Sequence, residues 1–333
     1  ISVLNSSAKL GLEAIKHGGL IFRGFKDKNT DAHTGFKAID SSTGERTSRD
    51  TDNLYQLMMT DSKKMIGYPD RSRSLICTTS SKTAKAYGGS SGAYVMIPLD
   101  GTKIVMSNTD DIFVTTMKIG DFYHGGPNKM RNLSSFFKSF GAKTDSGKWT
   151  NSSNIRAALK GQSPERLLLH WALLVQNDKG LVFDDEVDQK KWHALSNKWM
   201  SAITSNDMKI VDELEKVMKS GKYSISGRLE TAFNFFKKNI KDVYSAMANE
   251  LADPKTMELR LIDYGQEVPP NKECWFSGKC IAISFPVFAK MLLRLEEQGF
   301  PIHPSVNNKM SYEIKQAKAK EKNEDKQAIR KGE

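Results

Sequence analysis

Residues 71–88 read Arg-Ser-Arg-Ser-Leu-Ile-Cys-Thr-Thr-Ser-Ser-Lys-Thr-Ala-Lys-Ala-Tyr-Gly, and this stretch decides how the chain is expected to fold. The apolar run at 75–77 predicts a short buried strand. A run of three hydroxyl residues follows it: Thr78, Thr79 and Ser80. Ser80 or Ser81 is a suitable N-cap for a helix, which the glycine pair at 88–89 is expected to end. The stretch therefore predicts a strand, a polar turn and a helix in direct succession.

A second strand is expected upstream, at residues 20–25, and it contains one charged side chain, Arg23. Burying a guanidinium without an anion costs several kcal/mol. We therefore expect Arg23 to have a partner if this strand is buried. The alternative is an edge strand from which Arg23 faces water.

Two pairs of β-like runs flank short turn sequences. Tyr94–Pro98 and Thr102–Met106 lie on either side of residues 99–101, and Lys272–Phe276 and Lys279–Ile283 flank Ser277-Gly278. Turn residues between two β-forming runs are typical of hairpins. Each pair is therefore expected to form two neighbouring strands.

The middle of the chain has helical periodicity and polar loops. Residues 227–251 carry apolar side chains at spacings of three and four, which predicts the longest helix of the chain. A long exposed loop is expected at 26–53, and residues 309–333 are expected to form a solvated helix or a disordered arm. Further helices are expected at 6–16, 54–66, 165–176, 207–219 and 286–298.

Composition narrows the class of protein. Hydrophobic residues make up 38% of the 333 residues, which is enough for a folded core and argues against disorder. The longest apolar stretch, 167–175, is far shorter than the roughly 20 residues of a membrane span, so no membrane association is expected. Three cysteines without CxxC spacing and six histidines without ligand spacing predict no disulfide scaffold and no metal site. A reducing compartment is expected.

The order of three motifs points to a family. Ile21-Phe-Arg23-Gly-Phe25, Ile76-Cys-Thr78-Thr-Ser80 and Asn271-Lys-Glu273-Cys-Trp275 together resemble the Arg, Ser-Thr-Ser and Glu signature of mono-ADP-ribosyltransferases. Residues 84–88 and 94–98 are similar to the helix and strand that follow the Ser-Thr-Ser motif in that family. The resemblance covers residues 1–107 and about 257–290, and the helical middle is unmatched.

The resemblance implies an NAD+ ADP-ribosyltransferase of the glycosyltransferase class that uses NAD as substrate and no metal. Arg23 would contact NAD, Thr78 would take the first position of the Ser-Thr-Ser motif, and Glu273 would be the catalytic carboxylate. These residue types suit the chemistry, because guanidinium groups bind phosphate oxygens and carboxylates stabilise an oxocarbenium ion. Further residues expected at the NAD site are Gly24, Thr79, Ser80, Tyr87 and Tyr94.

Two positions depart from the family pattern. Thr78 replaces the usual first Ser and keeps the hydroxyl. Asn271 stands where the family carries Glu or Gln, a position that helps to select the acceptor, so the acceptor type stays open. Glu267 is a second candidate for the catalytic carboxylate. We favour Glu273 because a β-forming run follows it directly, whereas Pro269-Pro270 comes soon after Glu267.

The fold implied by the resemblance is α+β, an ADP-ribosyltransferase-like split, mixed β core with an inserted helical subdomain. The expected parts are residues 1–107 as the first part of the core, 108–253 as the helical insertion, 254–300 as the second part with the catalytic Glu, and 301–333 as a charged C-terminal arm.

Partners are expected from the resemblance and from charge. Within the family, the chain is most similar to enzymes of tailed bacteriophages, some of which are packaged in the virion and modify host transcription or translation proteins. The start at Ile1 and the end at Gly332-Glu333 suit a processed virion protein, located in the virion or the host cytoplasm among other virion proteins. The net charge of +11 favours acidic partners, including nucleic acid. The alternative is a structural or nucleic-acid-binding virion protein with an inactive transferase-like fold.

Overall fold

The computed structural model describes residues 9–25, 35–46, 51–89, 92–99, 101–112, 129–175, 181–205 and 209–331. The chain divides into two compact units. Unit 1 comprises Ile1–Arg46, Gly67–Ile112 and Glu258–Glu333, and unit 2 comprises Thr47–Ile66 and Phe113–Met257. Residues 47–66, which the sequence assigns to the first part of the core, thus belong to the helical unit. The first three residues of the helix expected at 6–16 lie outside the described residues.

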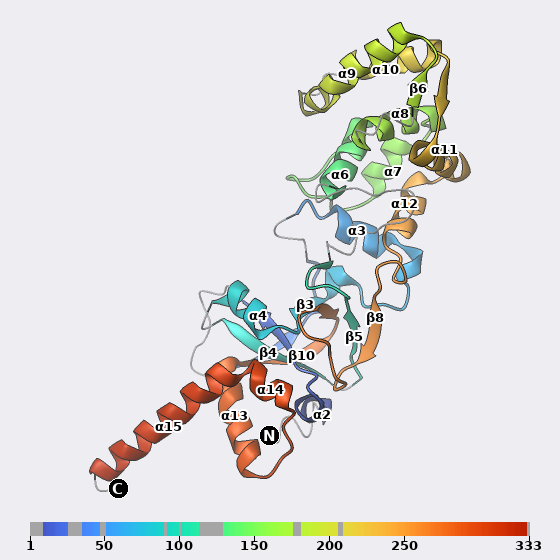
Figure 1. The fold of residues 1–333 in the computed structure, drawn as a ribbon. Helices are drawn as coiled ribbons and strands as arrows, with labels where there is room; N and C mark the ends of the chain where they lie inside the picture. Colours follow the sequence, from blue (N-terminus) through green and yellow to red (C-terminus); the bar gives the residue numbers. More distant parts are fainter. Residues whose placement is uncertain are drawn as a thin grey trace. The chain divides into compact units, whose positions relative to one another are not determined.

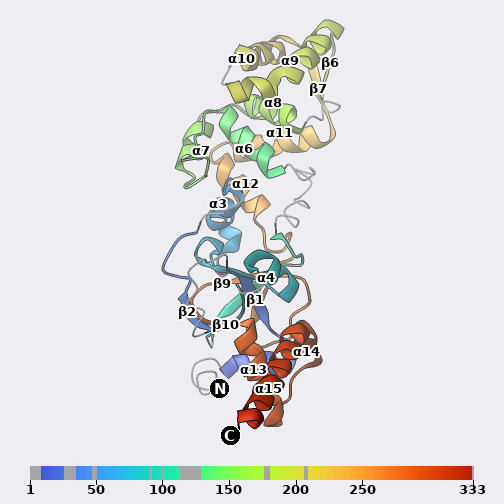
Figure 2. The same ribbon diagram turned by 90° about the vertical axis from the view of Figure 1, so that its left-hand side faces the viewer.

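Unit 1 is built on an eight-stranded sheet in the order β2-β10-β4-β1-β3-β9-β5-β8 (Figures 1 and 2). All pairings between its described strands are antiparallel, so the expectation of a mixed sheet is wrong, while the α+β class is confirmed. The strands are β1 (Ile21–Gly24), β2 (Phe36–Asp40), β3 (Leu75–Thr78), β4 (Ala93–Pro98), β5 (Lys103–Met106), β8 (Arg260–Asp263), β9 (Glu273–Phe276) and β10 (Lys279–Ser284).

The sheet is weakly joined between β1 and β3. A single residue pair, Phe22 with Thr78, connects these two strands, whereas β1 and β4 share four pairs. The sheet therefore consists of two four-stranded halves, β2-β10-β4-β1 and β3-β9-β5-β8.

Both predicted hairpins are wrong as pairings, although all four of their runs form strands. β4 lies in one half of the sheet and β5 in the other, and β9 and β10 are separated in the same way. Each turn therefore leads from one half of the sheet into the other. The strand beside β4 is β10, which comes from a distant part of the sequence and pairs with β4 over five residues. Turn residues permit a reversal, but the apolar strand faces decide which strands meet.

Helices α4 (Ser81–Gly88) and α13 (Phe285–Glu297) pack on the sheet of unit 1. Helix α4 contacts β1, β3 and β4, and its end at Gly88 with Gly89 as C-cap is as predicted. Helix α13 contacts β4 and β10, and its Phe285 ring lies 5.5 Å from the Phe22 ring in an edge-on arrangement. The remaining helices of unit 1 are α2 (Lys9–His17), α14 (Pro304–Lys309) and α15 (Ser311–Lys331), together with the 3-10 helix η2 (Arg71–Arg73).

The expected C-terminal arm is a helix, and its first turns are part of unit 1. Helix α15 packs against α13 and buries Glu313 and Ala317. The side chains of residues 318–320 are exposed, and Figure 1 shows the end of the helix running away from the sheet. The first half of the arm is therefore core and only the second half is solvated.

Unit 2 is helical, with its own apolar core. Helix α8 contacts α6, α10 and α11, which lie around it in Figure 2. The single long helix expected at 227–251 is wrong: it is broken into α11 and α12, because Asp242 caps a new helix by accepting a 3.0 Å hydrogen bond from the Ser245 N–H. The elements are α3 (Leu54–Asp61), η1 (Lys63–Met65), α6 (Lys129–Ser139), α7 (Ser153–Leu159), α8 (Pro164–Val175), β6 (Leu181–Phe183), α9 (Glu186–Ser205), α10 (Lys209–Ser220), β7 (Tyr223–Ile225), α11 (Gly227–Asn239) and α12 (Val243–Leu251).

Across the described ranges of both units, no helix combines the length and the apolar character that a membrane crossing requires.

Candidate functional site

The three motif strands are neighbours in the sheet, in the order β1-β3-β9. Thr78 pairs with Phe22 on one side and with Glu273 on the other. Phe22, Thr78 and Glu273 thus lie side by side on three adjacent strands, and Arg23 follows Phe22 in β1. Motifs that lie far apart in the sequence thus converge at the narrow junction between the two halves of the sheet.

Arg23 lies on a central strand, between β4 and β3, so the edge-strand alternative is wrong. Its Nη1 donates a hydrogen bond to the carbonyl oxygen of Ile76, and its Cζ lies 5.2 Å from the centre of the Phe25 ring. Its Nε atom is buried without a hydrogen-bond partner. Among the described residues, no carboxylate forms an ion pair with Arg23. The guanidinium is half-buried, and no described carboxylate balances its charge by direct contact.

Two other arginines lie near Arg23. Burial lowers the pKa of Arg23, and the positive charges of Arg46 and Arg71 lower it further, while the Cys77 thiol acts in the opposite direction. Both charges therefore act against that of Arg23, although Arg71 is itself paired with Glu273. An anion placed among them would relieve the repulsion.

The Glu273 carboxylate is buried at the start of β9, with its side chain 11% exposed. Its Oε1 accepts a hydrogen bond of 2.9 Å from Arg71 Nη2, and its Oε2 accepts one of 3.2 Å from the Ile112 backbone N–H. The backbone of Glu273 is also fixed, because its N–H donates to the Thr109 carbonyl at 2.8 Å and its carbonyl accepts from the Ser107 N–H at 2.9 Å. The carboxylate therefore has one defined position.

Arg71 and Ile112 are site residues that the sequence reasoning missed. Arg71 lies in a polar run before β3, where an arginine is ordinarily read as a solvated side chain, yet its own side chain is 7% exposed. The one indication in the sequence that Arg71 lies near the site was its position four residues before the apolar run at 75–77, which leads into the three hydroxyl residues. No sequence pattern marks Ile112, because the contact is made by its backbone.

The hydroxyl residues shape the turn between β3 and α4. Thr78 Oγ1 accepts from the Ser80 N–H at 3.1 Å, and Ser80 Oγ accepts from the Thr83 N–H at 3.2 Å, which makes Ser80, one of the two predicted candidates, the N-cap of α4. Thr79 Oγ1 donates to the Pro269 carbonyl at 2.7 Å and accepts from the Lys272 N–H at 2.8 Å. Thr79 thereby ties the turn to the segment that leads into Glu273.

The three remaining NAD-site candidates occupy different surroundings. Gly24 lies against α4, where an added Cβ would sit 2.2 Å from the Ala84 carbonyl oxygen, so its absent side chain is needed for packing. Tyr94 is buried on β4 opposite Arg23, with its ring 5.3 Å from the Phe25 ring. Tyr87 is 56% exposed on α4.

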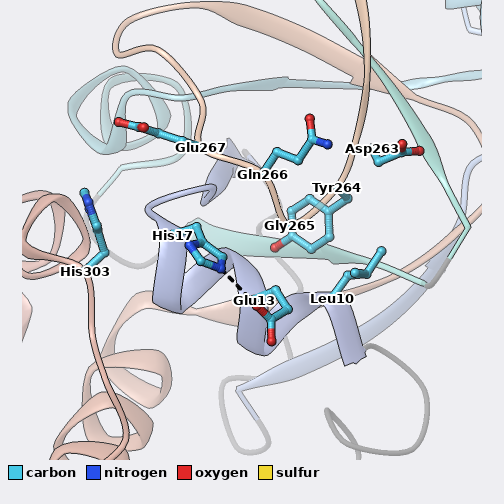
Figure 3. Close-up of a pocket in the computed structure, with 9 residues that line it drawn as sticks. All are labelled: Leu10, Glu13, His17, Asp263, Tyr264, Gly265, Gln266, Glu267 and His303. Carbon is cyan, nitrogen blue, oxygen red and sulfur yellow. Dashed lines mark hydrogen bonds and ion pairs between the residues drawn. The ribbon is translucent and has the colours of Figure 1, made fainter.

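The two other candidates precede β9. Asn271 is exposed and has a left-handed backbone with φ of 54°, so it stands in a turn before the strand and not on its face. Glu267 is exposed and lines a cavity of about 480 Å³. Figure 3 shows that this cavity is formed by α2, by the segment that follows β8 and by His303.

The surroundings of Glu267 differ from those of Glu273. The cavity beside Glu267 also holds Glu13 and His17, which contact each other at 3.0 Å (Figure 3), and no arginine lines it. Glu273, in contrast, is bonded to Arg71, whose charge acts on Arg23. Of the two carboxylates, only Glu273 is bonded to an arginine whose charge acts on Arg23.

Within the described ranges, the cysteines and the possible metal ligands do not form a competing site. Burial raises the pKa of Cys77 and of Cys280 to about 12, which leaves both as neutral thiols. The part of the chain that the structure describes holds no group of three His, Cys, Asp or Glu side chains that would bind a metal ion.

Comparison with known proteins identifies no relative: no family model, no curated protein and no solved structure matches the chain. Function is therefore inferred from the residues gathered at the junction between β1, β3 and β9.

Proposed function

We propose that this chain is an NAD-dependent mono-ADP-ribosyltransferase whose site lies where β1, β3 and β9 meet. The observation that carries the proposal is the pair of charges there: a half-buried guanidinium, Arg23, without a carboxylate partner among the described residues, and a buried, positioned carboxylate, Glu273. NAD offers groups that complement both, namely an anionic diphosphate and a ribose that becomes positively charged as its glycosidic bond breaks.

The proposed role of Arg23 is to bind the diphosphate. At neutral pH the two phosphates of NAD carry two negative charges, and guanidinium groups form strong charge-assisted hydrogen bonds to phosphate oxygens. Arg46 and Arg71 add positive charge near Arg23. An anion bound at Arg23 would offset the unfavourable effect of these charges on its guanidinium, which supports the assignment of Arg23 to the diphosphate.

The proposed role of Glu273 is to stabilise the transition state. The bond between ribose C1′ and the nicotinamide nitrogen breaks, nicotinamide leaves as a neutral molecule, and the acceptor nucleophile forms the new bond to C1′ and loses a proton to solvent. A carboxylate held beside the ribose hydroxyls stabilises the intermediate positive charge on the sugar. Because two hydrogen bonds already fix Glu273, little reorganisation is needed during the reaction.

The proposed acceptor is a host protein, which follows from the resemblance to phage enzymes and not from any contact in the structure. The exposed Asn271 stands two residues before Glu273, where the acceptor side chain is expected to approach.

The decisive experiment incubates the purified chain with NAD labelled on the adenylate, in the presence of host lysate, and measures label transfer and nicotinamide release. The parent is expected to show both, and Glu273→Gln, which keeps the shape of the side chain and removes its charge, is expected to lose both. Glu267→Gln is the matched control and is expected to retain them. Loss in Glu267→Gln with activity kept in Glu273→Gln would move the catalytic role to Glu267.

One observation favours the alternative, a structural or nucleic-acid-binding protein with an inactive transferase-like fold. Glu273 forms a buried ion pair with Arg71, and such a pair also occurs in proteins without catalytic activity. If the parent neither releases nicotinamide nor binds NAD by calorimetry, the alternative replaces the enzyme. Salt-dependent binding of nucleic acid would then be the next measurement.

A further inference from the structure

We infer that Arg71 is a positioning residue for the Glu273 carboxylate. The inference depends on the proposed transferase activity and adds a specific role within that site. Arg71 is not part of the three motifs, and its role comes from the contact between Arg71 Nη2 and Glu273 Oε1 at 2.9 Å. Both side chains are buried, at 7% and 11% exposure.

The contact leaves the carboxylate able to bind a substrate. An ionised carboxylate has about four acceptor directions on its two oxygens. Arg71 occupies one on Oε1, and the Ile112 N–H occupies one on Oε2. Among the described residues these are the side-chain contacts of the carboxylate, so one direction on each oxygen remains for the hydroxyl groups of a ribose, while the orientation of the carboxylate is already fixed.

Arg71 is itself held in place by the segment around it. Asp70 accepts from the Ser72 N–H at 2.8 Å and its carbonyl accepts from Ser74 Oγ at 2.6 Å. The Trp275 indole N–H, on the same strand as Glu273, donates to the Pro69 carbonyl at 2.9 Å. The short helix η2 is thus held against β9. Because the backbone of Arg71 is held in place, its guanidinium can hold the Glu273 carboxylate in one orientation.

The charges around the pair explain why an arginine is needed. The carboxylate is required as an anion, and burial opposes any buried negative charge. Arg71 supplies the compensating charge by direct contact. Arg23 does not take this role, since its Nη1 bonds to the Ile76 carbonyl and it makes no ion pair with a described carboxylate.

The test compares Arg71→Met, Arg71→Lys and Arg71→Ala with the parent, by measuring nicotinamide release over a range of NAD concentrations. We expect Arg71→Met to lower kcat about 100-fold, as is typical for a misplaced catalytic group, while KM for NAD changes less than about threefold. Arg71→Lys keeps the positive charge but lacks the planar guanidinium with its several N–H donors, and it is expected to lower kcat about tenfold. Added guanidinium ion is expected to restore activity to Arg71→Ala, because it can refill the vacated site.

Arg73→Met is the matched control, since Arg73 belongs to the same short helix but pairs with Glu45 at the surface. It is expected to keep the kcat and KM of the parent. Circular dichroism of every variant shows whether the fold is kept. If Arg71→Met does not fold, the role of Arg71 is tested with Arg71→Lys and with guanidinium rescue of Arg71→Ala.

The outcomes separate the two proposals. A parent without activity overturns the transferase proposal, and the role of Arg71 with it. An active parent whose Arg71 variants keep the parental kcat overturns the role of Arg71 alone. A fall in stability without a fall in kcat would make the ion pair purely structural, which also overturns the inference.

Discussion

Thr78 and Glu273 lie directly opposite each other on the adjacent antiparallel strands β3 and β9. Residues 113–257, which form most of unit 2, come between them in the sequence. The Thr79 N–H donates to the Lys272 carbonyl at 2.9 Å, which fixes the register of this strand pair at its end. The proposed site is therefore defined by strand pairing between distant parts of the chain, and the following predictions test its separate parts.

Gly24→Ala is expected to destabilise unit 1 and to displace α4. The new Cβ would lie 2.2 Å from the Ala84 carbonyl oxygen and 2.4 Å from the Gly88 nitrogen, both of which are backbone atoms that cannot rotate away. Overpacking of this kind costs about 1–3 kcal/mol in free energy of unfolding. Urea unfolding followed by circular dichroism measures the loss.

Gly44→Ala provides the control for this substitution, because an added Cβ at residue 44 meets nothing within 4 Å. It is expected to change the free energy of unfolding by less than about 0.5 kcal/mol. Equal effects of the two substitutions would contradict the close packing of β1 on α4.

Arg23→Met is expected to weaken NAD binding without reducing stability. Arg23 is half-buried without a described carboxylate partner, and its replacement by an apolar side chain of similar length removes the cost of keeping that charge partly out of water. Loss of hydrogen bonds to a charged group corresponds to about 1.5–3 kcal/mol, or about a 10- to 100-fold rise in the Kd for NAD. Calorimetric titration with NAD gives the Kd, and thermal unfolding gives the stability.

Arg260→Met serves as the comparison for Arg23→Met, since Arg260 is exposed on the edge strand β8. Its Kd for NAD is expected to equal that of the parent. A parental Kd in Arg23→Met would remove Arg23 from the NAD site.

His170 in unit 2 is expected to make stability depend on pH. It is fully buried, its Nδ1 lies 2.6 Å from Ser139 Oγ, and its ring stacks on Phe140 at 4.1 Å between ring centres. Burial lowers the pKa of His170 to about 3, from an ordinary value of about 6.5. Between these values the unfolded chain binds a proton that the folded chain does not, so stability falls as the pH falls, by at most about 1.4 kcal/mol per pH unit.

Chemical unfolding of the parent and of His170→Gln at pH 7, 6 and 5 measures this effect. The parent is expected to lose stability on acidification, most steeply below pH 6.5, whereas His170→Gln loses this contribution. Parallel pH dependences would contradict a neutral, buried His170.

Two truncations are expected to differ in effect. Removal of residues 320–333 takes away the part of α15 whose described side chains are mostly exposed, and it is expected to leave the fold and NAD binding intact. Removal of residues 304–333 also takes away Val306 and Met310, which are fully buried in the core of unit 1, at a cost of about 1.5–3 kcal/mol for each. Denaturant midpoints of the two truncated chains distinguish these expectations, and equal midpoints would show that α14 adds nothing to the core.

Much of the local structure in unit 1 was predicted from the sequence, but β2 lies where a long exposed loop was expected at 26–53, and β8 was not predicted. Short apolar runs became β1, β3, β4, β5, β9 and β10, and Ser80 caps α4, because burial and capping depend on nearby residues. Strand pairing was not predictable from the same runs. A run of four to six β-forming residues carries little information about which other strand it pairs with. The strands on either side of each turn sequence were therefore expected to pair with each other as hairpins.

The candidate site was predicted only in part, for a related reason. Arg23, Thr78 and Glu273 were recognised by residue type and order, and they lie on neighbouring strands. Arg71 and the Ile112 N–H were missed, because a contact between a polar loop and a distant strand leaves no periodic signal. The break at Asp242 was missed because the apolar spacing continues through it, although the capping aspartate was visible.

The crossing of β4 to β5 and of β9 to β10 between the two halves of the sheet has a consequence for synthesis on the ribosome. When residue 257 has been made, unit 2 is complete, but β3 and β4 still lack β9 and β10. Both strands then expose unpaired, apolar edges, which are sites of aggregation. The nascent chain is therefore expected to need shielding by chaperones until its last eighty or so residues emerge, even though its helical unit can fold much earlier.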